Sequence, residues 1–255
     1  MSRNKLTRDE RRALLSATLK AGERGRRIDY EAIPFWQKLL ALFGIPAESN
    51  PYEMERLPVL TGVLIAITFF VSIQCFQNPE LFSWLAFYPD HLARLGGLNL
   101  LTCFFVHGGW VHLLSNMYVF FIFGDNVEDV LGHFRFGLLL VAATAAGSIA
   151  SATSGVGADI PHVGASGGIS GVMIFYLLAF PRARFTYFVF FWFYRLPAVW
   201  VLFFYLFVQL SGAFQQLAGV GEVDYLAHIG GGLAGLVAWL LAGRPRDAED
   251  PDLWA

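Results

Sequence analysis

The sequence predicts an all-α protein: a polytopic membrane bundle of six transmembrane helices, with both termini in the cytoplasm. Three observations lead to this prediction. Hydrophobic residues make up 56% of the chain and charged residues only 15%, whereas soluble domains carry about 25% charged residues. The apolar residues gather in runs long enough to cross a bilayer core of about 30 Å. Finally, nearly all positive charges fall on one side of the predicted topology.

Residues 1–56 form a charged N-terminal extension, which we place in the cytoplasm. It contains two weak amphipathic patterns, at residues 9–15 and 35–40. The second is expected to lie along the membrane surface with its aromatic and leucine side chains in the interface, or else to belong to a cytosolic tail without activity.

Six spans are predicted within one membrane domain, residues 57–243, which a cytoplasmic tail of residues 244–255 follows. The fifth span begins near Pro197, because proline suits the first turn of a helix and damages its interior. Residues 185–194, rich in Phe and Tyr, are then expected at the interface. The predicted spans are residues 57–77, 108–124, 136–153, 166–180, 196–214 and 224–242.

The loop charges orient these spans. Eleven of the 18 Lys and Arg residues precede residue 57, and with the N-terminus inside only Arg94 falls on the outer side. The positive-inside rule therefore places both termini in the cytoplasm. No signal peptide is visible, so the first span is expected to act as the targeting signal, and we expect a bacterial plasma membrane. The net charge of −2 gives no indication of a nucleic-acid partner.

Serine and glycine cluster where the third loop enters the fourth span, in the stretch Gly164-Ala165-Ser166-Gly167-Gly168-Ile169-Ser170-Gly171. Glycines leave a hydroxyl uncovered, and a serine at a helix N-terminus places N–H donors beside any oxyanion that it creates. Ser166 is preferred to Ser170 as a nucleophile because it lies nearer the outer surface. The same pattern is also common in helix packing within membranes.

His228 lies about one turn inside the sixth span, in a stretch where Ala227, Gly231 and Gly235 recur every four residues. This small-residue face suits close contact with another helix. If that helix is the fourth span, His228 Nε2 can act as a general base toward a serine. The alternative is a histidine that bonds a backbone carbonyl. Asp224, one turn earlier, is expected to be a solvated helix-start residue or to orient the imidazole.

Three polar residues open the second span: His107, His112 and Asn116. His112 and Asn116 share one helical face and both can donate hydrogen bonds. A zinc site is not expected, because no Cys or Glu joins the histidines at ligand spacing. No cofactor is expected either. Cys75 and Cys103 are interpreted as free buried thiols.

At these residues the sequence resembles the rhomboid family of intramembrane serine proteases, over about residues 57–241. The stretch Leu98-Asn99 departs from the Trp-Arg pair that the family often carries in its first loop. The resemblance is carried by four motifs in the family's order: His107-x4-His112-x3-Asn116, Gly124-x3-Glu128-x3-Gly132, Gly164-Ala165-Ser166-Gly167 and Ala227-His228-x2-Gly231-x3-Gly235.

The resemblance implies a role for each matching position. Ser166 would be the nucleophile and His228 the base of a dyad without a carboxylate. His112, Asn116 and the backbone N–H of Ser166 would line the oxyanion hole, and His107 matches a motif position without an assigned role. A short fourth span would leave the dyad in a water-filled cavity open to the outside. The glycines of these motifs and one acidic residue are read as structural: Gly164, Gly167, Gly231, Gly235, Glu128 and Gly132.

The function expected from the resemblance is hydrolysis of peptide bonds in or near the transmembrane segments of other membrane proteins. The alternative is a non-catalytic relative that binds transmembrane clients, which would be expected to lack the serine or the histidine. A small transporter is a third possibility, but it predicts mid-span carboxylates and an inverted repeat, and neither is seen. The partners are thus transmembrane substrates and the bilayer, and the sequence does not set the oligomeric state.

Overall fold

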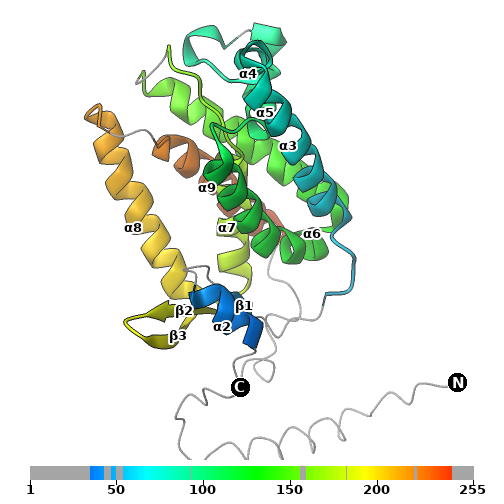
Figure 1. Cartoon of the computed structure of the whole chain (residues 1–255), viewed down its shortest axis with the longest axis vertical. Coiled ribbons are helices and arrows are strands. Elements are labelled where there is room, and N and C mark those ends of the chain that lie inside the picture. The colour runs from blue at the N-terminus through cyan, green and yellow to red at the C-terminus, as the bar shows by residue number, and fades with distance from the viewer. Residues whose placement is uncertain are drawn as a thin grey trace, which may run out of the picture. The chain divides into compact units, whose positions relative to one another are not determined.

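The computed structural model describes residues 35–42, 47–49, 54–92, 94–155, 159–181, 183–220 and 223–242, which fall into two compact units. One unit holds the longer helices, and the other holds a short helix with three strands (Figure 1). The amphipathic pattern at residues 9–15, most of the N-terminal extension and the tail of residues 244–255 lie outside the described residues.

The helical unit confirms the prediction of a mostly helical, apolar protein. Within the described residues, four helices are long and apolar enough to cross a membrane: α3 (Val59–Gln77), α6 (Trp110–Thr153), α8 (Ala198–Leu217) and α9 (Tyr225–Ala242). A fifth, α7 (Ser166–Ala179), is a shorter apolar helix. Short helices and turns join α3 to α6: α4 (Pro79–Leu85), η2 (Pro89–His91), η3 (Arg94–Gly97), α5 (Asn99–Thr102) and η4 (Cys103–Phe105).

Helix α6 is 44 residues long and contains the third predicted span and all but the first two residues of the second. At about 1.5 Å per residue it is roughly twice as long as one crossing requires. Gly132 interrupts it with φ 73° and ψ 157°, a conformation open to glycine and costly for other residues. The predicted turn between the two spans is therefore helical almost throughout and leaves helical geometry at Gly132.

Glu128 fastens this part of α6 to the start of α3. Its buried carboxylate accepts hydrogen bonds of 2.7 Å from the backbone N–H groups of Leu60 and Thr61, and another of 2.7 Å from the Thr61 hydroxyl. The N–H groups in the first turn of a helix have no partner within the helix, and a negative charge there is favourable. Glu128 therefore joins α6 to Thr61 of α3, a residue 67 positions earlier in the sequence.

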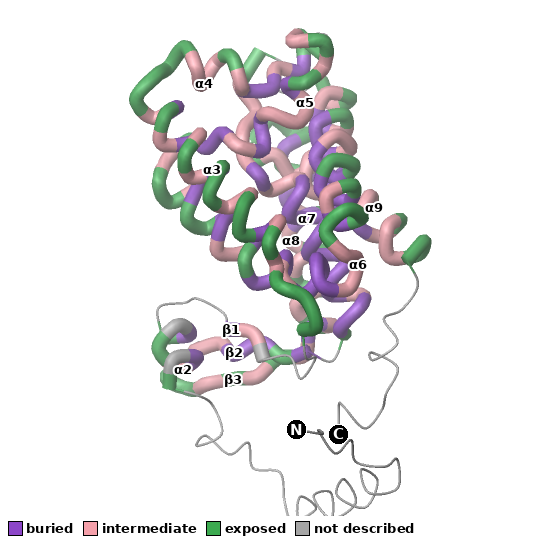
Figure 2. The backbone as a smooth tube through the Cα atoms, turned by 90° about the vertical axis from the view of Figure 1, so that its right-hand side faces the viewer, coloured by how far each residue is buried: buried purple, intermediate pink, exposed green. Residues whose placement is uncertain are grey.

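Helix α7 is the most enclosed of these helices, with 11 of its 14 residues buried, and it appears largely in purple in Figure 2. It packs between α6 and α9. Helix α8 is different, because many of its residues are exposed, the class drawn in green in Figure 2. Its large exposed side chains include Trp200, Phe203, Phe204, Phe207 and Phe214, as expected for a surface that faces lipid.

The second unit contains α2 (Phe35–Leu42) and a sheet in the order β1-β2-β3. Strand β1 (Ala47–Ser49) pairs antiparallel with β2 (Arg184–Val189), with Ala47 opposite Thr186. A two-residue turn leads from β2 to β3 (Trp192–Pro197), and both turn residues, Phe190 and Phe191, have positive φ.

The all-α prediction is thus wrong for this segment. Residues 185–194 were expected at the interface because they are rich in Phe and Tyr, but aromatic residues also favour strands. The alternating exposure along β3 is that of a strand with two different faces. Helix α8 begins at Ala198, directly after Pro197, as the proline predicted.

Candidate active site

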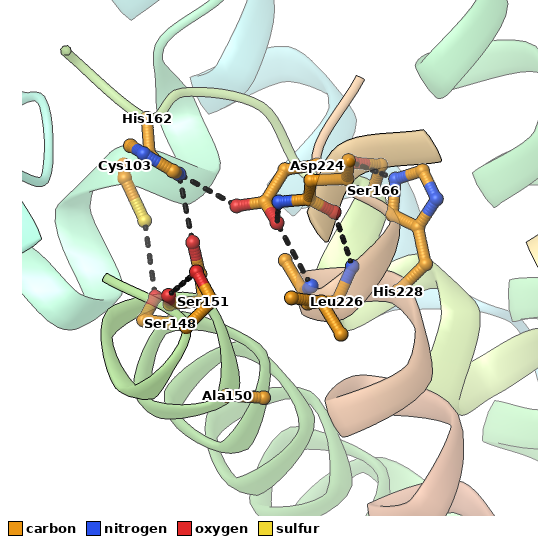
Figure 3. A network of polar contacts seen from close by, with 12 residues as sticks. Cys103, Ser148, Ala150, Ser151, His162, Ser166, Asp224, Leu226 and His228 are labelled. Carbon is orange, nitrogen blue, oxygen red and sulfur yellow. Dashed lines mark hydrogen bonds and ion pairs between the residues drawn. The ribbon is translucent and has the colours of Figure 1, made fainter. Parts of the chain in front are cut away.

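Ser166 and His228 meet where α7 and α9 begin. Ser166 is the first residue of α7, and its Oγ lies 2.8 Å from His228 Nε2 in the first turn of α9 (Figure 3). Both residues are only partly buried. A serine and a histidine 62 positions apart in sequence therefore stand at the distance that proton transfer from hydroxyl to imidazole requires.

Glycines bring the two helices this close. A β-carbon added to Gly231 would overlap the backbone oxygen of Gly167, and one added to Gly235 would overlap the backbone oxygen of Gly171. Both obstacles are backbone atoms, which cannot turn aside as a side chain can. The small-residue face predicted for the sixth span is thus the surface on which α9 contacts α7.

His112 lies beside the serine, separated from it by Gly164. A β-carbon on Gly164 would lie 2.7 Å from His112 Nε2 and 3.8 Å from Ser166 Oγ. Gly164 also has φ +122°, a conformation that side chains rarely adopt. The glycine therefore opens the space between the histidine ring and the hydroxyl.

Asn116 is one turn further along α6 and is buried. Its side-chain amide donates a 2.9 Å hydrogen bond to the backbone oxygen of His112. The structure thus brings Ser166, His228 and His112 together at one place and shows Asn116 bonded within its own helix. An amide nitrogen carries two hydrogens, so Asn116 keeps a second donor.

His107 supports the loop in front of the serine. It is fully buried, its Nδ1 lies 3.0 Å from Ser72 Oγ, and its Nε2 accepts a long hydrogen bond of 3.5 Å from the backbone N–H of Ala165. Burial, together with the neighbouring His112, lowers the pKa of His107 to about 3. The ring is therefore neutral near pH 7 and can accept the hydrogen bond from Ala165.

Ser170, the other serine of the glycine-rich stretch, has a different environment. Its hydroxyl donates a 2.7 Å hydrogen bond to the backbone oxygen of Ser166 and accepts one of 2.7 Å from the Tyr205 hydroxyl. It is buried beneath the first turn of α7. Ser170 is thus placed to support Ser166 from below, whereas the Ser166 hydroxyl faces the histidine.

The sequence reasoning missed Gln209. This buried residue of α8 places its Oε1 2.8 Å from His228 Nδ1, on the side of the ring away from the serine. The sequence did contain an indication of it, because burying an amide within an apolar span costs free energy and therefore marks a functional or interhelical contact.

Asp224 precedes the first residue of α9, as the helix-start expectation requires, but it is partly buried rather than fully solvated, and within the described residues its carboxylate bonds to groups other than the His228 ring. Its carboxylate lies 2.6 Å from His162 Nδ1 and accepts hydrogen bonds of 3.0 Å from Gln216 Nε2 and from the backbone N–H of Ala227 (Figure 3). Burial by itself raises the pKa of Asp224, but hydrogen bonds from His162, Ser151 and Gln216 lower it to about 2. Asp224 therefore fixes the start of α9 to its neighbours as a charged cap.

Comparisons with known proteins agree with this geometry. The chain is 30% identical over 216 residues to Rhomboid protein 1, mitochondrial, of Saccharomyces cerevisiae, covering 76% of this chain and 59% of the yeast protein. It is 30% identical over 152 residues to RHOMBOID-like protein 5 of Arabidopsis thaliana, covering 58% and 45%, respectively. It is 28% identical over 162 residues to Rhomboid-like protease 5 of Toxoplasma gondii, covering 63% and 18%.

In each case the chain spans less than two thirds of the relative's length. The family model described as Rhomboid domain matches residues 94–245, which include α6, α7, α8 and α9 together with every side chain of the Ser166–His228 site. This match covers more than half of the chain and confirms the resemblance read from the four motifs. The chain belongs to the rhomboid family.

Proposed function

We propose that the chain is an intramembrane serine endopeptidase in which Ser166 and His228 form the catalytic dyad. The observation that carries the proposal is the 2.8 Å separation between Ser166 Oγ and His228 Nε2 at the N-terminus of α7. Membership in the rhomboid family, and a relative whose name includes the word protease, support the same reaction.

The reaction follows from the positions of these groups. His228 Nε2 accepts the proton of the Ser166 hydroxyl while Oγ attacks a peptide carbonyl, which gives a tetrahedral oxyanion. The N–H of Ser166 at the helix N-terminus and the side chains of His112 and Asn116 stabilise that oxyanion. The proton then passes from His228 to the leaving amine, and water hydrolyses the acyl-enzyme by the same route.

The proposed function includes a six-span membrane topology. Helix α6, divided at Gly132, provides two spans, and with α3, α7, α8 and α9 the bundle has six. At about 1.5 Å per residue α7 is roughly 21 Å long, shorter than the bilayer core, so its serine lies below one membrane surface in contact with water. The loop charges support a topology with both termini in the cytoplasm and the dyad on the opposite side.

The substrates we propose are other membrane proteins, cut where a transmembrane helix unwinds, because a helix hides its carbonyls in hydrogen bonds. A bacterial plasma membrane remains the sequence-based proposal for its location. The curated relatives named above are eukaryotic, and one is designated mitochondrial, so they lend this location no support.

The test is cleavage of a single-span protein by the purified chain in liposomes, comparing wild type with Ser166→Ala, Ser170→Ala and His228→Ala. Product from wild type and from Ser170→Ala, with none from the other two, is the expected result. Loss in Ser170→Ala alone would move the nucleophile by one turn. If no form cleaves any of several substrates, the chain is a binder of transmembrane clients instead.

A further inference from the structure

One face of α8 carries polar groups, although the helix is otherwise apolar. Tyr205 and Gln209 are four residues apart, and Gln216 follows two turns later, so the three side chains lie on the same face. Gln209 and Gln216 are both buried. Polar side chains in a span carry a high cost unless they serve a contact or a function, and all three here contact residues of the helices that form the site.

Two of these contacts reach the two members of the dyad. Gln209 Oε1 lies 2.8 Å from His228 Nδ1. The Tyr205 hydroxyl donates to Ser170 Oγ at 2.7 Å, and Ser170 in turn donates to the backbone oxygen of Ser166 at 2.7 Å. Helix α8 thus contacts the ring of His228 directly through Gln209. It reaches the backbone oxygen of Ser166 indirectly, through Tyr205 and Ser170.

The chemistry of imidazole gives the Gln209 contact a specific meaning. A neutral histidine carries its hydrogen on one ring nitrogen and accepts at the other. To take a proton from Ser166, His228 must accept at Nε2 and carry its hydrogen at Nδ1, where it needs an acceptor. The oxygen of Gln209 lies at that position and is an uncharged acceptor, whereas serine protease triads use a carboxylate there.

We propose that Gln209 is a positioning residue that fixes His228 in the tautomer and ring orientation competent to act as a base. This inference rests on the proposed function of the Ser166–His228 pair. It assigns to α8 a part in the reaction: the dyad is complete only while α8 packs against α9. Gly212 permits that packing, because a β-carbon there would overlap the Tyr225 ring, which itself lies edge-on to the His228 ring at 6.0 Å.

The chain offers a matched control for this proposal. Gln216 is also a buried glutamine of α8 and also bonds to the start of α9, because it donates to Asp224 and accepts from the backbone N–H of Leu226 at 3.0 Å. Within the described part of the chain, these hydrogen bonds of Gln216 go to Asp224 and Leu226 and not to His228. Gln216→Leu therefore removes hydrogen bonds between the same two helices without touching the imidazole.

The experiment compares wild type, Gln209→Leu, Gln209→Glu and Gln216→Leu in liposomes, with kcat, KM and the pH dependence of kcat/KM as readouts. Gln209→Leu is expected to lower kcat roughly 10- to 100-fold at a similar KM, as expected when a buried donor loses its acceptor. Gln209→Glu is expected to retain most activity and to move the acid limb of kcat/KM to higher pH, because a carboxylate stabilises the imidazolium. Gln216→Leu is expected to have a lower melting temperature than wild type, with kcat and the acid limb of kcat/KM unchanged.

A second readout needs no substrate. In protein with 15N-labelled histidine, assigned against His228→Ala, the wild-type ring is expected to show hydrogen at Nδ1, and Gln209→Leu is expected to show a mixture of tautomers. Equal kcat, pH profile and tautomer in wild type and Gln209→Leu would overturn the proposal, as would equal losses of kcat in both Leu variants with the acid limb unmoved in Gln209→Glu. Should wild type cleave nothing, the proposed function fails, while the tautomer still tests the Gln209 contact.

Discussion

Gly164 is the residue on which the space between His112 and Ser166 depends. Its φ of +122° suits glycine, and a β-carbon there would lie 2.7 Å from His112 Nε2. The ring must move for any side chain to fit, which would displace the proposed oxyanion donor His112 from its place beside Ser166. Gly164→Ala is therefore expected to lower kcat about 100-fold or more, which is the usual cost of losing one oxyanion donor.

Cleavage kinetics in liposomes measure this loss. Gly155→Ala is the matched control, because Gly155 also has positive φ, +65°, but has no atom of the described residues within 4 Å of the added carbon. It imposes backbone strain without moving a site residue. Equal effects of the two variants on kcat would show that strain, and not displacement of His112, is responsible.

Asp224 connects the stability of the site to pH. Because its folded-state pKa is depressed to about 2, its charged form stabilises the fold above its unfolded pKa of about 4, and that contribution is lost as the pH falls from about 4 toward 2. Asp224→Asn is expected to lower the free energy of unfolding at pH 7 by about 2 kcal/mol, and the deficit should shrink across that window.

Thermal unfolding in detergent between pH 7 and pH 3 tests the Asp224 prediction. Asp159→Asn, at an exposed position of the loop before α7, serves as the control and is expected to follow wild type throughout. A deficit in Asp224→Asn that stays constant over the whole range would mean that the carboxylate acts by shape and hydrogen bonding alone.

At the level of elements, the α7–α9 contact depends on backbone meeting backbone. Gly231→Ala would drive a methyl group into the Gly167 carbonyl and separate the helices that carry Ser166 and His228. Overpacking of this kind costs about 1–3 kcal/mol, and more where only backbone can move. We expect a lower melting temperature together with a loss of activity, since the dyad spans the same contact.

Gly232→Ala is the control on the neighbouring residue. Among the described residues its added carbon would meet only Ile174 Cγ1, at 3.3 Å, a side-chain atom that can yield by a few tenths of an ångström. Its melting temperature and activity should stay close to those of wild type. Equal damage by the two variants would show that α9 tolerates no added volume on any face, which would remove the specific role of the Gly231 contact.

The same elements show what the sequence could and could not predict. The apolar runs located the long helices, because an uninterrupted stretch of about 20 apolar residues has few alternatives. Ser166 and His228 were found because polar groups beside glycines stand out within such runs. Gln209 was not, since a single amide does not reveal which helix it faces, and its partner lies 19 residues away on α9. Strands β2 and β3 were missed because aromatic residues are equally common at membrane interfaces and in sheets.

For the molecule as a whole, α3 separates two clusters of polar contacts. Near its start, Thr61 bonds Glu128; near its end, Ser72 bonds His107, which supports the loop before the dyad. Thr61 and Ser72 are 11 positions apart, which corresponds to about 16 Å along the helix axis. Glu128 and the dyad therefore belong to opposite ends of the bundle, and the two ends are expected to face opposite sides of the membrane.

Cysteine labelling in intact bacterial cells tests this arrangement. Asp159→Cys places an exposed thiol in the loop before α7, at the dyad end, and Arg135→Cys places one just after Gly132, at the Glu128 end. The two native thiols, Cys75 and Cys103, are buried, so the wild type gives the background. A membrane-impermeant maleimide is expected to label Asp159→Cys in intact cells and Arg135→Cys only after lysis, because basic loops stay in the cytoplasm.

The reverse labelling pattern would mean that the site faces the cytoplasm. Labelling of both in intact cells would mean that the segment between them crosses the membrane an even number of times, which is incompatible with one crossing by the second half of α6.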